Sequence, residues 1–267
     1  MSSVPRGVIE LGNGFYNCRG SYKIRGLIEL GTQCSLVRRS NGEWVFLDTY
    51  TLDDATRAWV EEKTGGPDKV SAILNLHPFH TMHTEAMHNQ FPSARLYGTD
   101  RHIARFADLA WQPERTESEA LHALFADDFD FSVPPGVHFV PDNENLHFAS
   151  VLAIHRASKT LHVDDTLLQV RIPWFLRWWP SLWGTRELTR FHPTLAKVLE
   201  ERPGAVSAFR EWAADLVERC GDVENLVAAH SRVLRPKRDG GPPIKVRVAA
   251  AFANVEKTLA AHHAVHG

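Results

Sequence analysis

A short apolar segment at residues 70–76 ends directly before three closely spaced histidines, His77, His80 and His83. A run of this length is typical of a strand, so the segment predicts a buried β-strand with the histidines at its carboxyl end. Imidazole is the commonest protein ligand for metals such as zinc and iron, but a metal pocket needs at least three or four donors. The segment therefore predicts the first half of a metal site, and other parts of the chain must supply the remaining donors.

Strand and helix signals alternate along the rest of the chain. Residues 34–48 predict a hairpin in which Asn41-Gly42, the favoured pair for a tight primed turn, joins two apolar arms. Asp53 is a suitable N-cap for a helix that ends at Gly65-Gly66. Further strands are predicted at 95–97, 136–140, 150–155, 160–163 and 226–229, and further helices at 84–91, from 99 or 100, from 209 to 220 and near 245–264. The consecutive strands favour an α/β fold of antiparallel sheets with helices packed outside.

The composition limits the class of protein. With 267 residues, of which 43% are hydrophobic, the chain can form one large α/β domain or two small ones. The net charge of -2 gives no reason to expect nucleic acid or an anionic membrane as a partner. Three cysteines, far apart in the sequence, argue against a disulfide framework, and neither a signal pattern nor an apolar stretch of membrane-spanning length is found. We therefore expect a cytoplasmic protein.

Three other segments place potential metal ligands next to predicted strands. His147 lies in a loop before one strand, Asp164 and Asp165 follow the next strand, and His230 ends a third. Side chains at the ends of separate strands can converge at one edge of a sheet, where the sites of α/β proteins tend to lie. The choice between Asp164 and Asp165 depends on the strand register, which the sequence leaves open.

In this order the motifs resemble those of the metallo-β-lactamase superfamily over residues 7–235. Residues 43–49, which read Glu-Trp-Val-Phe-Leu-Asp-Thr, are similar to an early family strand that ends in Asp-Thr. The histidine cluster is similar to the family's His-x-His-x-Asp-His motif when one inserted residue is allowed. His77, His80 and His83 then take the three histidine positions, and Met82 falls where the family has its aspartate.

The same resemblance assigns roles to the later donors. His147 matches the family's histidine in a loop before a strand, Asp165 matches the aspartate that bridges two metals, and His230 matches a histidine that ends a strand. The resemblance implies a single domain over residues 1–267 with an α/β fold, an αββα sandwich of two mixed sheets with helices on the outer faces. It also implies zinc as the cofactor, as one or two ions, with iron as an alternative.

Within this implied site the first metal binds His77, His80 and His147. The second metal has only His83 and His230 besides the bridging Asp165. Met82 weakens the second position, because a thioether is a soft ligand that suits copper(I) rather than zinc and cannot act as a general base. The chain is therefore interpreted as a divergent member of the superfamily with a degraded metal motif.

A filled site of this kind supports hydrolysis. A metal with three histidine ligands lowers the pKa of its bound water to about 7, and the metal-bound hydroxide attacks a carbonyl carbon or a phosphorus. Asp165 then bridges or accepts the proton, and His230 completes the second metal position or stabilises the oxyanion. The sequence thus predicts a metal-dependent hydrolase of a small, partly apolar ester, lactone, thioester or related substrate. The alternatives are a ligand-binding member of the fold that has lost its metal, which Met82 favours, and an iron-dependent oxidoreductase.

An insertion with four tryptophans, near 170–184, follows the Asp165 motif. We expect it to cover apolar surface at a subunit interface or in the core, ahead of a role as a wall or lid of the pocket. Membrane contact is a weaker interpretation, because the segment lacks a basic face. Together with the helix near 245–264, the insertion offers a surface on which a homodimer can form.

Four other residues have simpler interpretations. Asp48 is expected either to orient a ligand histidine or to stabilise its own loop. His88 is expected on the surface of its helix or next to a ligand. His155 and His162 lie within predicted strands, where they could face solvent, and are interpreted as residues without a role in the site.

Overall fold

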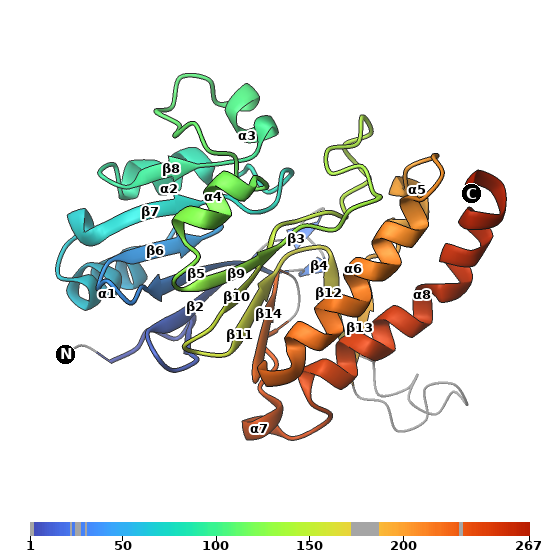
Figure 1. The fold of residues 1–267 in the computed structure, drawn as a ribbon. Helices are drawn as coiled ribbons and strands as arrows, with labels where there is room; N and C mark the ends of the chain where they lie inside the picture. The colour runs from blue at the N-terminus through green and yellow to red at the C-terminus, as the bar shows by residue number, and fades with distance from the viewer. Residues whose placement is uncertain (1–2, 22, 25–27, 30, 172–186, 230–231) are drawn as a thin grey trace. The chain divides into compact units, whose positions relative to one another are not determined.

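The structure is a computed structural model in which residues 3–21, 23–24, 28–29, 31–171, 187–229 and 232–267 are described. The chain forms two compact units. Figure 1 colours the chain by residue number. Unit 1 contains residues 1–133 and 150–162, and unit 2 contains residues 134–149 and 163–267. The organisation as a single domain, expected from the sequence, stays a prediction.

Unit 1 is built around a mixed sheet of six strands in the order β1-β2-β5-β6-β7-β8. The pairs from β1 to β6 are antiparallel, whereas β6, β7 and β8 run parallel to one another. These strands are β1 (Val8–Glu10), β2 (Phe15–Gly20), β5 (Thr32–Arg38), β6 (Trp44–Leu47), β7 (Val70–Leu74) and β8 (Arg95–Tyr97), and β3 (Lys23–Ile24) and β4 (Ile28–Glu29) form a separate small hairpin. Because β6, β7 and β8 are parallel, the loops that follow them leave the sheet at one edge.

Helices pack against the six-stranded sheet. The helices of unit 1 are α1 (Asp54–Thr64), α2 (Thr84–Gln90), α3 (Asp100–Arg105) and α4 (Glu119–Leu124). Trp59 of α1 and Met87 of α2 pack into one buried apolar cluster with Phe46 of the sheet. As predicted, Asp53 caps α1, because its side chain accepts the backbone N–H of Thr56.

A second sheet of unit 1 lies against the first. Its antiparallel strands are β9 (Phe129–Ser132), β10 (Leu152–His155) and β11 (Thr160–Val163). The ring centroid of Phe15 in β2 lies 5.7 Å from that of His155 in β10. The Ser35 hydroxyl in β5 lies 3.0 Å from Nδ1 of His162 in β11. The space between the two sheets is therefore part of the core of unit 1, and both histidines lie in it.

The turn of the hairpin between β5 and β6 differs from the prediction. Arg39 donates its backbone N–H to the carbonyl of Glu43, so three residues rather than two form the loop. Gly42 has a φ of 90°, whereas Asn41 is not among the residues with positive φ. A type I′ turn needs positive φ at both of its central residues. Only Gly42 of the pair has it, so Asn41-Gly42 does not form the predicted primed turn.

The strand predicted at residues 136–140 is also wrong. Val137 forms only an isolated bridge with Leu199. The regular strand of this region is β9, which ends before Pro134-Pro135. Consecutive prolines lack backbone N–H groups, so the ladder cannot continue through them.

Unit 2 has an aromatic core and two long helices. Its elements are β12 (Leu167–Arg171), β13 (Glu187–Phe191), α5 (Leu195–Val198), α6 (Ala205–Arg219), β14 (Asn225–Ala228), α7 (Pro236–Asp239) and α8 (Ile244–His266), with β12 and β13 antiparallel. Phe148, Phe191, Phe209 and Trp212 contact one another in its core. No helix in the described part of the chain combines the length and apolarity that a membrane crossing requires.

Candidate metal centre

The histidine cluster follows β7, a central strand of the six-stranded sheet in unit 1. The backbone N–H of Leu76 donates to Oδ1 of Asp48 at 2.7 Å. The backbone N–H of Asp48 in turn donates to the carbonyl of Leu74 at 2.8 Å. Asp48 follows β6, which is parallel to β7, so the two loops meet at the same edge of the sheet. The predicted buried strand is present, and Asp48 holds the residue that precedes His77.

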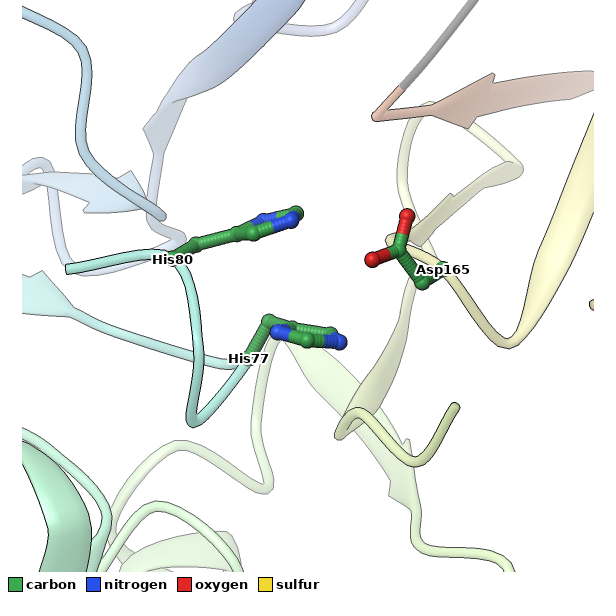
Figure 2. A group of neighbouring side chains, drawn as sticks. All are labelled: His77, His80 and Asp165. Carbon is green, nitrogen blue, oxygen red and sulfur yellow. The ribbon is translucent and has the colours of Figure 1, made fainter. Parts of the chain in front are cut away.

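His77 and His80 place two imidazoles side by side, as Figure 2 shows. Their ring centroids are 4.1 Å apart and their planes differ by 27°, so the rings are stacked. His77 is buried and His80 is half-buried. Two cationic rings at this distance repel each other, so the arrangement suits neutral imidazoles that act as ligands of one cation.

One contact of His77 bears on how it can bind a metal. Its Nδ1 accepts the backbone N–H of Phe79 at 3.1 Å. A neutral ring that accepts at Nδ1 carries its proton on Nε2, whereas a ring that binds metal through Nε2 carries the proton on Nδ1. Metal binding through Nε2 of His77 therefore requires that the contact with Phe79 is broken.

His83 and Met82 have surroundings of another kind. Nδ1 of His83 lies 2.8 Å from the hydroxyl of Thr51. Burial lowers the pKa of His83, and the neighbouring His80 lowers it further. The side chain of Met82 is 68% exposed. Met82, which the sequence resemblance places where the family has its aspartate, is thus a thioether at the surface.

In unit 2, His147 and Asp165 lie next to each other. Nδ1 of His147 is 3.7 Å from Oδ2 of Asp165, and the carboxylate is buried while the imidazole is 40% exposed. Thr166 donates its hydroxyl hydrogen to the carbonyl of Phe148 at 2.9 Å, which ties the loop of His147 to the segment after β11. Two residues that the sequence predicts as ligands are therefore brought together within this unit.

His77 and His80 of unit 1 and Asp165 of unit 2, which Figure 2 draws as sticks, each carry an atom that can bind a metal ion. Imidazole nitrogens, as in His77 and His80, and carboxylate oxygens, as in Asp165, are ligands that suit zinc or iron. His230 lies outside the described residues, as does most of the tryptophan-rich insertion at 172–186. The roles expected for His230 and for that insertion stay predictions.

His155 and His162 do not take the solvent-facing positions that the strand pattern allowed. Both side chains are buried, and all four residues of β11 are buried, so this strand has no solvent face. Nε2 of His162 lies 2.8 Å from Oδ2 of Asp48, which itself holds the backbone of Leu76. His162 therefore contacts Asp48 next to the loop of His77 and His80, and the sequence did not predict this contact. The sequence signal for the burial of this strand is the lack of charged residues in Thr-Leu-His-Val, residues 160–163.

His155 makes the stability of unit 1 dependent on pH. Burial lowers its pKa to about 4, and Asp128 opposes this effect. The unfolded chain has a His pKa of about 6.5, so it binds more protons than the folded chain between these values. Stability is therefore lost as the pH falls from about 6.5 to about 4, and the loss at pH 5 is about 2 kcal/mol.

We expect the His155→Phe variant to lack this part of the pH dependence. Phenylalanine keeps a ring between Phe15 and Phe129 but does not titrate. Urea unfolding at pH 7.5 and pH 5 measures the effect in the variant and in the natural chain. The natural chain is expected to lose about 2 kcal/mol more than the variant. Equal losses would show that His155 does not stay neutral in the folded protein.

Known structures identify the fold, although no protein-family model and no curated protein matches the sequence. A metallo-β-lactamase from Pontibacter korlensis matches at 13% identity, over 92% of this chain and 98% of that chain, with a TM-score of 0.54. One from Erythrobacter litoralis, with β-mercaptoethanol in its active site, matches at 13% identity, over 92% and 96%, with a TM-score of 0.57. FIM-1 from Pseudomonas aeruginosa, in its mono-zinc form, matches at 10% identity, over 93% and 95%, with a TM-score of 0.53. These matches confirm the fold predicted from the sequence: the chain has the α/β fold of the metallo-β-lactamases.

Proposed function

We propose that the protein is a metal-dependent hydrolase in which His77 and His80 bind a divalent metal ion and Asp165, predicted as a ligand from the order of the motifs, is a further ligand. The stacked pair of imidazoles carries this proposal, because two imidazoles held 4.1 Å apart after a buried strand are suited to share a cation. The mono-zinc form of the similar FIM-1 structure supports a site for one ion. In this proposal Asp165 is a ligand, and the partly exposed His147 is its neighbour rather than a ligand.

The surrounding residues would carry out the proton transfers of hydrolysis. A metal ion bound there would supply a water molecule of lowered pKa and would polarise the substrate oxygen that gains charge. Asp165 is buried, so its carboxylate is held in place and can accept a proton from the attacking water. His147 lies 3.7 Å from that carboxylate and is 40% exposed, so it can pass the proton on to solvent.

Met82 supports the choice of a partly apolar substrate. Its side chain is 68% exposed in the loop that carries His77 and His80. An exposed, flexible thioether next to a polar site can contact the apolar part of a bound molecule. Together with a site that polarises a carbonyl oxygen, this favours a small ester, lactone, thioester or related compound.

Metal analysis followed by an assay tests the proposal. Protein purified without added metal is analysed by mass spectrometry for zinc and iron, and hydrolysis of p-nitrophenyl esters, lactones and thioesters is measured before and after chelation. Near-stoichiometric zinc and hydrolysis that chelation abolishes are expected. Iron with redox activity would support an oxidoreductase instead. A chain that binds neither ion after titration would be a ligand-binding member of the fold, and the proposal would be wrong.

We expect the Met82→Asp variant to bind a second metal ion. The substitution restores the carboxylate of the family motif next to His83, and the exposed position tolerates a charge. Equilibrium dialysis against zinc measures the number of ions per chain, with Met82→Leu as the control that keeps the residue apolar. A stoichiometry unchanged from that of the control would mean that the one-residue insertion in the histidine motif is misplaced.

A further inference from the structure

A chain of buried polar side chains in unit 1 leads to the loop of His77. Asn17 in β2 donates its side-chain N–H to Oγ of Ser35 at 3.0 Å, and Ser35 lies 3.0 Å from Nδ1 of His162. Nε2 of His162 lies 2.8 Å from Oδ2 of Asp48. The other oxygen of Asp48 accepts the backbone N–H of Leu76 at 2.7 Å. We call this series, Asn17 to Ser35 to His162 to Asp48, the buried polar chain.

His162 donates a hydrogen bond to Asp48. Nε2 of His162 lies 2.8 Å from Oδ2 of Asp48, and a carboxylate only accepts, so Nε2 carries the hydrogen. Nδ1 of His162 lies 3.0 Å from the Ser35 hydroxyl, which also accepts the side-chain N–H of Asn17.

The same three residue types form the catalytic triad of serine hydrolases, but here they cannot do that chemistry. In a serine hydrolase the carboxylate binds Nδ1 and the serine binds Nε2, whereas the two nitrogens are exchanged in the buried polar chain. Ser35 and His162 are also fully buried, so no substrate reaches the hydroxyl.

Asp48 links His162 to the backbone just before His77. Asp48 has a φ of 58°, a left-handed conformation that is strained for a non-glycine residue. Its backbone N–H donates to Leu74 and its carboxylate accepts from Leu76, so it contacts both sides of the end of β7. Loss of the His162 donor would leave one oxygen of a buried carboxylate less well satisfied and would loosen its hold on Leu76.

We propose that His162 is a positioning residue that fixes the loop of His77 and His80 through Asp48. Its consequence for metal affinity rests on the proposed function, whereas its effect on the loop does not. Residues that orient metal ligands from outside typically change metal affinity by about 10- to 100-fold when they are replaced. His162 is expected to fall in this class although it lies on another sheet.

Hydrogen exchange of the metal-free protein tests the effect on the loop. The His162→Phe variant keeps a ring of similar volume and removes both hydrogen bonds, and we expect the peptide over residues 75–83 to exchange about tenfold faster. His162→Gln retains an N–H donor for Asp48 and is expected to restore slow exchange. His155→Phe is the matched control, since His155 is a buried histidine of the adjacent strand whose Nδ1 contacts Ser158. Slow exchange of this peptide in His162→Phe, or equal acceleration in His155→Phe, would overturn the proposal.

Zinc affinity, measured by competition with a chromophoric chelator, tests the consequence for the metal. The affinity of His162→Phe is expected to be about 10- to 100-fold below that of the natural chain, and that of His155→Phe to be unchanged. If the natural chain binds no zinc, the proposed function is wrong, and hydrogen exchange still decides on the positioning role. If His162→Phe does not fold, Ser35→Ala replaces it, with the same peptide expected to exchange faster and unchanged exchange counting against the proposal.

Discussion

Replacing His77 by alanine is expected to lower the affinity for zinc by about a hundredfold or more, because the change removes a ligand rather than a residue that orients one. His77 is buried and stacked on His80, so its ring is held in place before any metal binds. Affinity is measured by competition with a chromophoric chelator, and circular dichroism verifies that the variant is folded.

His88 provides the control for this experiment. It lies on α2, close in sequence to the cluster, and it is half-buried. The His88→Ala variant is expected to bind zinc as tightly as the natural chain. The loss of a ligand lowers zinc affinity far more than threefold. If the zinc affinity of His77→Ala is within threefold of that of His88→Ala, His77 is not a ligand.

Replacing Asp165 by asparagine is expected to lower kcat/KM for ester hydrolysis by about 10²- to 10⁴-fold, the range typical of a lost general base. Asparagine keeps the shape of the side chain and removes the charge that would bind metal and accept the proton. Asp164→Asn is the matched control, because Asp164 is the adjacent carboxylate and is also buried. Kinetics and metal content are measured for both variants.

The two aspartate variants also decide a question that the sequence leaves open. Strand register decides whether Asp165 or Asp164 is the ligand. His147 lies 3.7 Å from Asp165, which favours that residue. A large loss of activity in Asp164→Asn with little change in Asp165→Asn would exchange their roles and contradict the proposed site.

Local signals predicted those elements whose causes are local. The apolar run before His77 forms β7, and Asp53 caps α1 as expected, because length, apolar pattern and capping chemistry act over a few residues. The turn at Asn41-Gly42 was harder, since the choice between two- and three-residue loops depends on how β5 and β6 pair.

The surroundings of the candidate site depend on packing and were less accessible. His162 stands in a four-residue strand, and whether such a strand faces solvent is decided by the sheet against which it packs. Ser35, Asp48 and His162 are far apart in the sequence and become partners only when the two sheets of unit 1 meet. His147 and Asp165 were predicted as ligands from their places in the motif order, and the distance between them had to come from the structure.

A crystal of zinc-loaded protein tests most directly the proposal that His77 and His80, with the predicted ligand Asp165, bind one metal ion. Anomalous diffraction recorded above and below the zinc absorption edge locates any bound ion. A single peak within about 2.0–2.2 Å of one nitrogen of each histidine and one oxygen of Asp165 is predicted. The absence of a peak there, with the two imidazoles hydrogen-bonded to protein groups instead, would contradict the claim.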